Sequence, residues 1–109
     1  MPVKNIKSEK EFNSLSKDGN VLVDFYADWC GPCKILSPII EKVSKDYDTV
    51  TFAKVDVDSQ QELAQRFSVM SIPTVIFFKN GKQVERFSGA LPEDELKEKI
   101  DEVFWFLLF

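Results

Sequence analysis

Residues 21–34 read VLVDFYADWCGPCK. The first half, up to Ala27, is a near-continuous apolar run, which is typical of a strand buried on both faces of a parallel sheet. Over residues 32–47 the apolar positions recur at helical spacing instead. The Cys30-Gly31-Pro32-Cys33 motif therefore lies where a central strand ends and a helix begins. In α/β sheets this is the usual place for an active site.

The order of the motif predicts different chemistry for its two cysteines. Cys30 is at the helix N-terminus, where free N–H groups and the helix dipole stabilise a thiolate and lower the thiol pKa. Cys33 is on the same helical face and near enough to close a disulfide. Pro32 suits the first turn because its missing N–H needs no partner there, and Gly31 leaves the Cys30 sulfur approachable. We expect Cys30 to attack a disulfide and Cys33 to resolve the product.

The cysteine pair has two other possible interpretations. The pair could be half of a zinc site, but tetrahedral zinc needs four ligands, and the chain has two Cys and no His. Only a dimer sharing two such pairs, or recruited carboxylates, could complete the set. The cysteines could also be inert buried thiols. The spacing favours redox chemistry and no metal.

Asp24 is an acid in the middle of the apolar strand, on the same face as Leu22 and Tyr26. Burial raises the pKa of a carboxyl, because it disfavours the charged form. Asp24 is thus a candidate proton acceptor for Cys33, whose thiolate must form before it can attack a mixed disulfide. Lys54, on a neighbouring predicted strand, could approach Asp24 and tune it. The alternative for Asp24 is an acid at a locally wet or bulged position without a catalytic role. The alternative for Lys54 is a solvated strand lysine.

The rest of the chain predicts alternating strands and helices. Capping boxes at Ser8 and Ser59 open short helices, and Asn80-Gly81 is a strong hairpin signal. We expect strands near residues 3–6 and over 21–27, 51–57, 74–79 and 83–88, and helices after Ser8, over 32–47, after Ser59 and after Pro92. Pro38 should kink the second helix. This order predicts crossover units followed by one hairpin, hence a mixed sheet covered on both faces.

Length and composition bound the class of protein. The 109 residues, 44% apolar and 29% charged, fit one globular domain spanning residues 1–109. The net charge of −4 and the lack of a Lys/Arg cluster argue against nucleic-acid binding. No apolar run is long enough to span a membrane, and no signal-peptide pattern opens the chain. We therefore expect a cytoplasmic protein in a reducing compartment, where a structural disulfide is improbable.

Residues 23–34 resemble the active-site segment of the thioredoxin family. The resemblance continues through Pro38, residues 54–56, Ser71-Ile72-Pro73-Thr74, Asn80-Gly81 and Ser88-Gly89-Ala90, and it covers residues 3–103. It implies an α/β thioredoxin fold, a five-stranded mixed sheet flanked by four helices. It implies a cis Ile72–Pro73 bond, with the Ile72 backbone pairing with substrate. The docking surface around Cys30 would comprise Trp29, Gly31, Pro32, Ile72, Pro73, Gly89 and Ala90.

The resemblance also implies a function. A general protein-disulfide reductase would act through Cys30 and Cys33, maintain cell redox homeostasis and hold no bound cofactor. Reducing equivalents would come from NADPH through thioredoxin reductase. Implied targets are peroxiredoxins, methionine sulfoxide reductase and ribonucleotide reductase. Two alternatives stay open, namely a disulfide oxidase or isomerase, whose relatives usually carry His at the position of Pro32, and a binding or chaperone module without redox turnover.

Two departures from the family pattern stand out. Tyr26 replaces the Trp or other aromatic residue of many members, and we interpret it as tolerated. The chain ends on the apolar run Phe104 to Phe109 instead of a polar segment. That tail could lengthen the last helix onto the core, form a partner or self-association patch on an otherwise monomeric protein, or reflect truncation.

Overall fold

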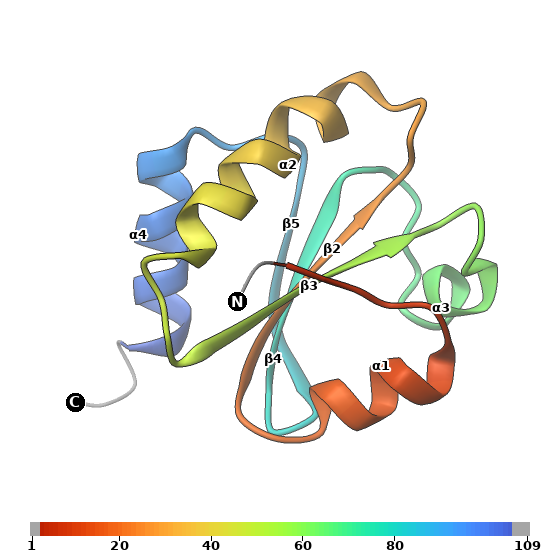
Figure 1. The fold of residues 1–109 in the computed structure, drawn as a ribbon, viewed down its shortest axis with the longest axis horizontal. Helices are drawn as coiled ribbons and strands as arrows, with labels where there is room; N and C mark the ends of the chain where they lie inside the picture. Colours follow the sequence, from red (N-terminus) through yellow and green to blue (C-terminus); the bar gives the residue numbers. More distant parts are fainter. Residues whose placement is uncertain (1–2, 106–109) are drawn as a thin grey trace.

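The computed structural model describes residues 3–105, which form a five-stranded sheet with helices on both faces (Figure 1). The sheet order is β1-β3-β2-β4-β5. The elements are β1 (Lys4–Asn5), α1 (Glu9–Ser16), β2 (Asn20–Tyr26), α2 (Gly31–Ser44), β3 (Val50–Asp56), α3 (Gln61–Arg66), β4 (Thr74–Lys79), β5 (Lys82–Ser88) and α4 (Glu93–Phe104). The predicted mixed sheet with four helices is confirmed.

Strand β2 is the centre of the sheet. It pairs in parallel with β3 and antiparallel with β4, and its residues from Val21 to Phe25 are all buried. β1 adds to β3 in parallel, and β5 adds to β4 through the Asn80–Gly81 hairpin. Both hairpin residues have positive φ, 50° and 86°, as the predicted turn requires. Both faces of β2 are covered, which explains why its sequence is a near-continuous apolar run.

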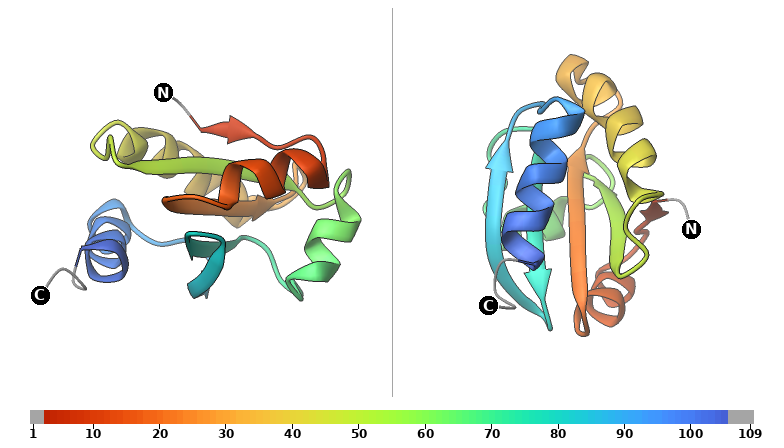
Figure 2. Two further views of the ribbon diagram at one scale, coloured as in Figure 1. Left: turned by 90° about the horizontal axis from the view of Figure 1, so that it is seen from below. Right: turned by 90° about the vertical axis from the view of Figure 1, so that its left-hand side faces the viewer.

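Two hydrophobic layers sandwich the sheet. One packs α2 and α4 against the face that carries Leu22 and Phe77, and the other packs α1 and α3 against the face that carries Val23 and Ile76. In Figure 2, right, α2 and α4 lie side by side across the strands. Strand alternation places Asp24 on the α2 face, with Leu22. The cysteine helix therefore covers the buried acid.

The first predicted capping box is confirmed. The Ser8 hydroxyl accepts the backbone N–H of Glu11 at 3.0 Å, and the Glu11 carboxylate accepts the N–H of Lys7 at 3.0 Å. The Ser8 bond satisfies a donor that the first turn of α1 leaves free, and the Glu11 bond ties down the residue before the cap, so an eight-residue helix can start at a defined residue.

Ser8→Ala should lower the free energy of unfolding by ~1 kcal/mol, because one helix N–H loses its partner. Chemical denaturation of the two proteins measures the difference. Ser8→Asp is the matched control, since it restores an acceptor and should unfold close to the parent. Equal stability of all three proteins would show that the cap contributes nothing.

The second predicted capping box is wrong. Helix α3 begins at Gln61 with Gln60 before it, and no side chain in the described part of the chain caps it. The Asp56 carboxylate accepts the N–H of Asp58, and the Ser59 hydroxyl donates to the Asp56 carbonyl. A tight turn after β3 therefore uses the hydroxyl that the pattern assigned to the helix.

Strand β4 has the predicted bounds, α1 begins directly after Ser8 and α4 directly after Pro92, and the other boundaries differ from the predictions by at most three residues. β1 is only two residues long, and α2 ends at Ser44, earlier than expected. Pro38 lies inside α2, as predicted, and the kink that we expected there stays a prediction. None of the helices in residues 3–105 combines the length and apolar character that a bilayer crossing requires.

The apolar tail is only partly described. Phe104 is the last residue of α4 and is buried against Phe77, and Trp105 packs partly buried on the same core. The last helix thus extends to the first residue of the tail, Phe104, and the tail packs on the core as far as Trp105. Residues 106–109, on which the association hypothesis also rests, lie outside the described residues.

Candidate active site

The two cysteines form a disulfide at the start of α2. Cys30 is the N-cap residue in an extended conformation, and its sulfur accepts the backbone N–H of Cys33 at 3.2 Å. Both residues are buried, with exposed fractions of 4% and 2%. Because this N–H points at the Cys30 sulfur, the same geometry stabilises negative charge there once the bond is reduced.

An exposed rim surrounds Cys30. The Trp29 side chain is 70% exposed, and its indole N–H donates to the Asp58 carboxylate at 2.8 Å. The carbonyl oxygen of Ile72 lies 3.7 Å from the Cys30 sulfur. The Ile72–Pro73 peptide bond is cis, as the resemblance implied. Three segments that are distant in sequence therefore meet in this rim, and one of them, the Ile72 loop, reaches the Cys30 sulfur.

Two further contacts hold the proline loop in place. The Gly89 N–H donates to the Pro73 carbonyl at 2.9 Å, with Gly89 at φ 89° and the exposed Ala90 beside it. The Thr74 hydroxyl donates to the Ser71 carbonyl at 2.6 Å. The structure thus joins Ile72, Pro73 and Gly89 around the cysteines, and Gly31 and Pro32 are exposed beside Cys30 on α2.

Asp24 lies under α2 with an exposed fraction of 1%, and its Oδ1 has no hydrogen-bond partner within residues 3–105. Burial raises the pKa of this carboxyl from 3.8 to about 7, and the positive charge of Lys54 opposes the rise. A group with this pKa exchanges protons near neutral pH. The predicted raised pKa therefore follows from the packing.

Lys54 is the register partner of Asp24 on β3. Its ammonium lies over the Tyr26 ring, 5.4 Å from the ring centroid, and it makes no ion pair with Asp24 among the described contacts. The cation–π contact holds the charge beside the acid without neutralising it directly. Tyr26, read from the sequence as a tolerated departure, therefore has a definite contact in the site.

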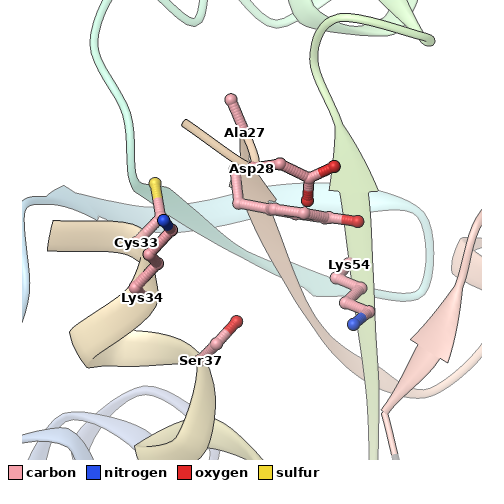
Figure 3. Close-up of a pocket in the computed structure, with 7 residues that line it drawn as sticks. Ala27, Asp28, Cys33, Lys34, Ser37 and Lys54 are labelled. Atoms are coloured by element: carbon pink, nitrogen blue, oxygen red, sulfur yellow. The ribbon is translucent and has the colours of Figure 1, made fainter. Parts of the chain in front are cut away.

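A pocket of about 320 Å³ opens on the Cys33 side of the disulfide (Figure 3). Its lining residues come from the end of β2, from α2 and from β3, and they are Tyr26, Ala27, Asp28, Cys33, Lys34, Ser37 and Lys54. Cys30 is not among them. The two sulfurs therefore face different surroundings, since Cys30 lies at the Trp29–Ile72 rim and Cys33 at the pocket.

Sequence reasoning missed Ser37 and Asp58. Ser37 is four residues after Cys33 on α2, so the helical repeat alone could have placed it under the resolving sulfur. Asp58 carried no signal, because its contact with Trp29 depends on how β3 lies beside β2. Among residues 3–105, no cluster of three or more His, Cys, Asp or Glu side chains is arranged to hold a metal ion.

Comparison with known proteins identifies the family of this chain. The Thioredoxin family model matches residues 3–102. The chain belongs to the thioredoxin family. It is 50% identical over 97 residues to a thioredoxin of Mycoplasmoides gallisepticum, covering 88% of this chain and 97% of that protein. The fold and the Cys30–Cys33 pair agree with this membership.

Solved thioredoxin-family structures have the same fold. A thioredoxin structure of Plasmodium falciparum is 42% identical with a TM-score of 0.86, covering 92% of this chain and 98% of that one. A second solved chain is 32% identical to this one, with a TM-score of 0.84. The match covers 92% of this chain and 94% of that chain. It comes from work on the thiol resolving mechanism of yeast mitochondrial 1-Cys peroxiredoxin via glutathione/thioredoxin systems.

Membership of the thioredoxin family sets the activity. The protein is a thiol-disulfide oxidoreductase that reduces disulfides through the Cys30–Cys33 dithiol. Members of the family are typically reduced by thioredoxin reductase.

Proposed function

We propose that Cys30 attacks the substrate disulfide and that Cys33 resolves the intermediate. The observation that carries this assignment is the Cys33 N–H directed at the Cys30 sulfur at the helix start. The Cys30 thiolate displaces one substrate thiolate and forms a mixed disulfide. Cys33 loses its proton, attacks the Cys30 sulfur and releases the second substrate thiolate. The substrate gains two electrons and the Cys30–Cys33 pair loses two.

Asp24 is the proton acceptor for Cys33 in this mechanism. It lies under the helix that carries Cys33, it is almost fully buried, and its pKa of about 7 suits proton exchange at neutral pH. The proton that Cys33 loses protonates the Asp24 carboxylate, and it later returns to solvent or to the released thiolate. Lys54 tunes Asp24, because its positive charge favours the ionised carboxylate.

The substrate-docking surface around Cys30 is formed by Trp29, Gly31, Pro32, Ile72, Pro73, Gly89 and Ala90. Support comes from the exposed indole, from the Ile72 carbonyl beside Cys30 and from the Gly89–Pro73 hydrogen bond. An extended substrate segment that pairs with the Ile72 backbone would bring its own disulfide to the Cys30 sulfur. Asp58 fixes the indole at the edge of this surface.

The redox partners of this protein follow from its family. NADPH supplies the electrons through thioredoxin reductase. Disulfide-bearing proteins are the targets, namely peroxiredoxins, methionine sulfoxide reductase and ribonucleotide reductase. The structural neighbour from the yeast peroxiredoxin study supports the first of these. We place the protein in the cytoplasm, as a monomer with one domain over residues 1–109.

Brief alkylation of the reduced protein tests the two sulfur roles. Iodoacetamide should label Cys30 in preference to Cys33, because only Cys30 is the N-cap residue whose thiolate the helix N–H groups stabilise. Peptide mass mapping after short exposure measures the ratio. The denatured protein is the control, since its two thiols should label equally. Preferential labelling of Cys33 would reverse the assignment.

A further inference from the structure

The proposed proton transfer leaves a gap between donor and acceptor. Asp24 does not line the pocket on the Cys33 side, but two of its immediate neighbours on the sheet do. Tyr26 follows it on the same face of β2, and Lys54 is its partner on β3. A proton must pass from the Cys33 sulfur, at the pocket wall, to a carboxyl behind that wall.

One hydroxyl from α2 faces this gap. Ser37 lines the same pocket as Cys33, one helical turn further along α2, and its side chain points toward the space between Cys33 and Lys54 (Figure 3). Within the described residues, its Oγ makes no hydrogen bond to another protein group, whereas Ser44 on the same helix donates to the Glu41 carbonyl at 2.7 Å. The Ser37 hydroxyl is therefore free to bond a water in the pocket.

The pocket is suited to hold such a water. Its volume of about 320 Å³ is many times what one water needs, and its polar lining offers several partners. The polar and charged residues that line it, besides Cys33 and Ser37, are Tyr26, Asp28, Lys34 and Lys54. Asp56 adds negative charge near Tyr26, and β4 contributes apolar Val75 beside Asp24.

We propose that Ser37 is a positioning residue that holds a water between Cys33 and Asp24, so that the proton lost by Cys33 reaches the carboxylate. This inference rests on the proposed role of Asp24. The Cys33 S–H donates its proton to the water, and the water passes one of its own protons to Asp24. The thiolate then attacks the Cys30 sulfur, as described above. The hydroxyl can donate to the water or accept from it, so it suits both states.

Single-turnover kinetics with a symmetric disulfide peptide separates the two chemical steps. Attack by Cys30 releases the first peptide thiol, and resolution by Cys33 releases the second. In Ser37→Ala, the second release should slow about five-fold, the loss expected for one neutral hydrogen bond. The first release should be unchanged. The pH midpoint of the second release should rise, because the ionised carboxylate loses a hydrogen-bonded water.

Three further variants complete the test. Ser37→Thr keeps the hydroxyl and should resolve within two-fold of the parent rate, and Ser44→Ala, the same change elsewhere on α2, should have no effect. Equal second-release rates in Ser37→Ala and the parent, or a Ser37→Thr variant as slow as Ser37→Ala, would overturn the proposal. Asp24→Asn separates the role of Ser37 from the role of Asp24. If it slows resolution while Ser37→Ala does not, only the role of Ser37 is wrong. If neither slows, Asp24 is not the acceptor.

Discussion

Replacing Cys33 with Ser should lower multiple-turnover disulfide reduction by about a thousand-fold or more, as when other covalent mechanisms lose a reacting group. Cys30 keeps its place at the N-cap of α2 and still receives the backbone N–H of residue 33, because that bond does not involve the replaced side chain. It therefore still attacks, but nothing within the protein displaces the product. The mixed disulfide should accumulate.

Non-reducing electrophoresis after incubation with a disulfide-bearing protein measures this accumulation. The Cys33→Ser variant should give adducts that dithiothreitol removes. Cys30→Ser is the matched control, since it also has one thiol but lacks the attacking one, and it should give few adducts. Equal trapping by both variants would show that either sulfur can attack. A Cys30→Ser variant that still reduces disulfides would show that Cys30 is not the attacking thiol.

Asp24→Asn should change the pH dependence of stability. In the parent, the folded-state pKa of Asp24 is about 7, above the 3.8 of the unfolded chain, so folding penalises the ionised form. The contribution of Asp24 to the free energy of unfolding is complete below pH 3.8. It falls as pH rises and reaches its lowest value above pH 7. The difference between the two pKa values corresponds to ~4 kcal/mol. The Asn side chain does not ionise, so the Asp24→Asn variant should not lose this stability as pH rises.

Urea unfolding of the oxidised proteins between pH 5 and pH 8 measures the effect. Histidine and cysteine titrations do not overlap that of Asp24 in this pH range, because the chain has no histidine and the disulfide-bonded cysteines do not titrate. The stability of the parent should fall across the window, and the gap to the Asn variant should be largest above pH 7. Parallel curves for the two proteins would mean that the Asp24 pKa is not raised.

The same variant should also slow reduction at pH 7 by about ten-fold, which is below the usual contribution of a general base because water in the pocket can accept the proton instead. Asp48→Asn is a control carboxyl change at an exposed position that does not face the pocket. It should leave the resolution rate and the pH profile of stability unchanged. A slower resolution step in Asp48→Asn would show that the effect of Asp24→Asn is not specific to the buried carboxyl.

Local sequence pattern predicted much of this molecule. The apolar run of β2, the helical repeat after Cys33 and the Asn80-Gly81 turn each identify an element from its own residues, because side-chain period and turn geometry are local properties. The face of β2 that carries Asp24 follows from alternation alone. The unequal environments of Cys30 and Cys33 follow from their order at a helix start.

Tertiary structure alone brought the distant segments together. The approach of the Ile72 carbonyl to Cys30, the bond from Trp29 to Asp58 and the pairing of Gly89 with Pro73 join residues on different strands and loops. The same packing used Ser59 in a turn instead of a helix cap, and it placed Ser37 in a pocket with Lys54. The periodicity of one segment reports which side chains share a face. The crossover connections and the strand register determine what that face meets, since they depend on the packing of the whole chain at once.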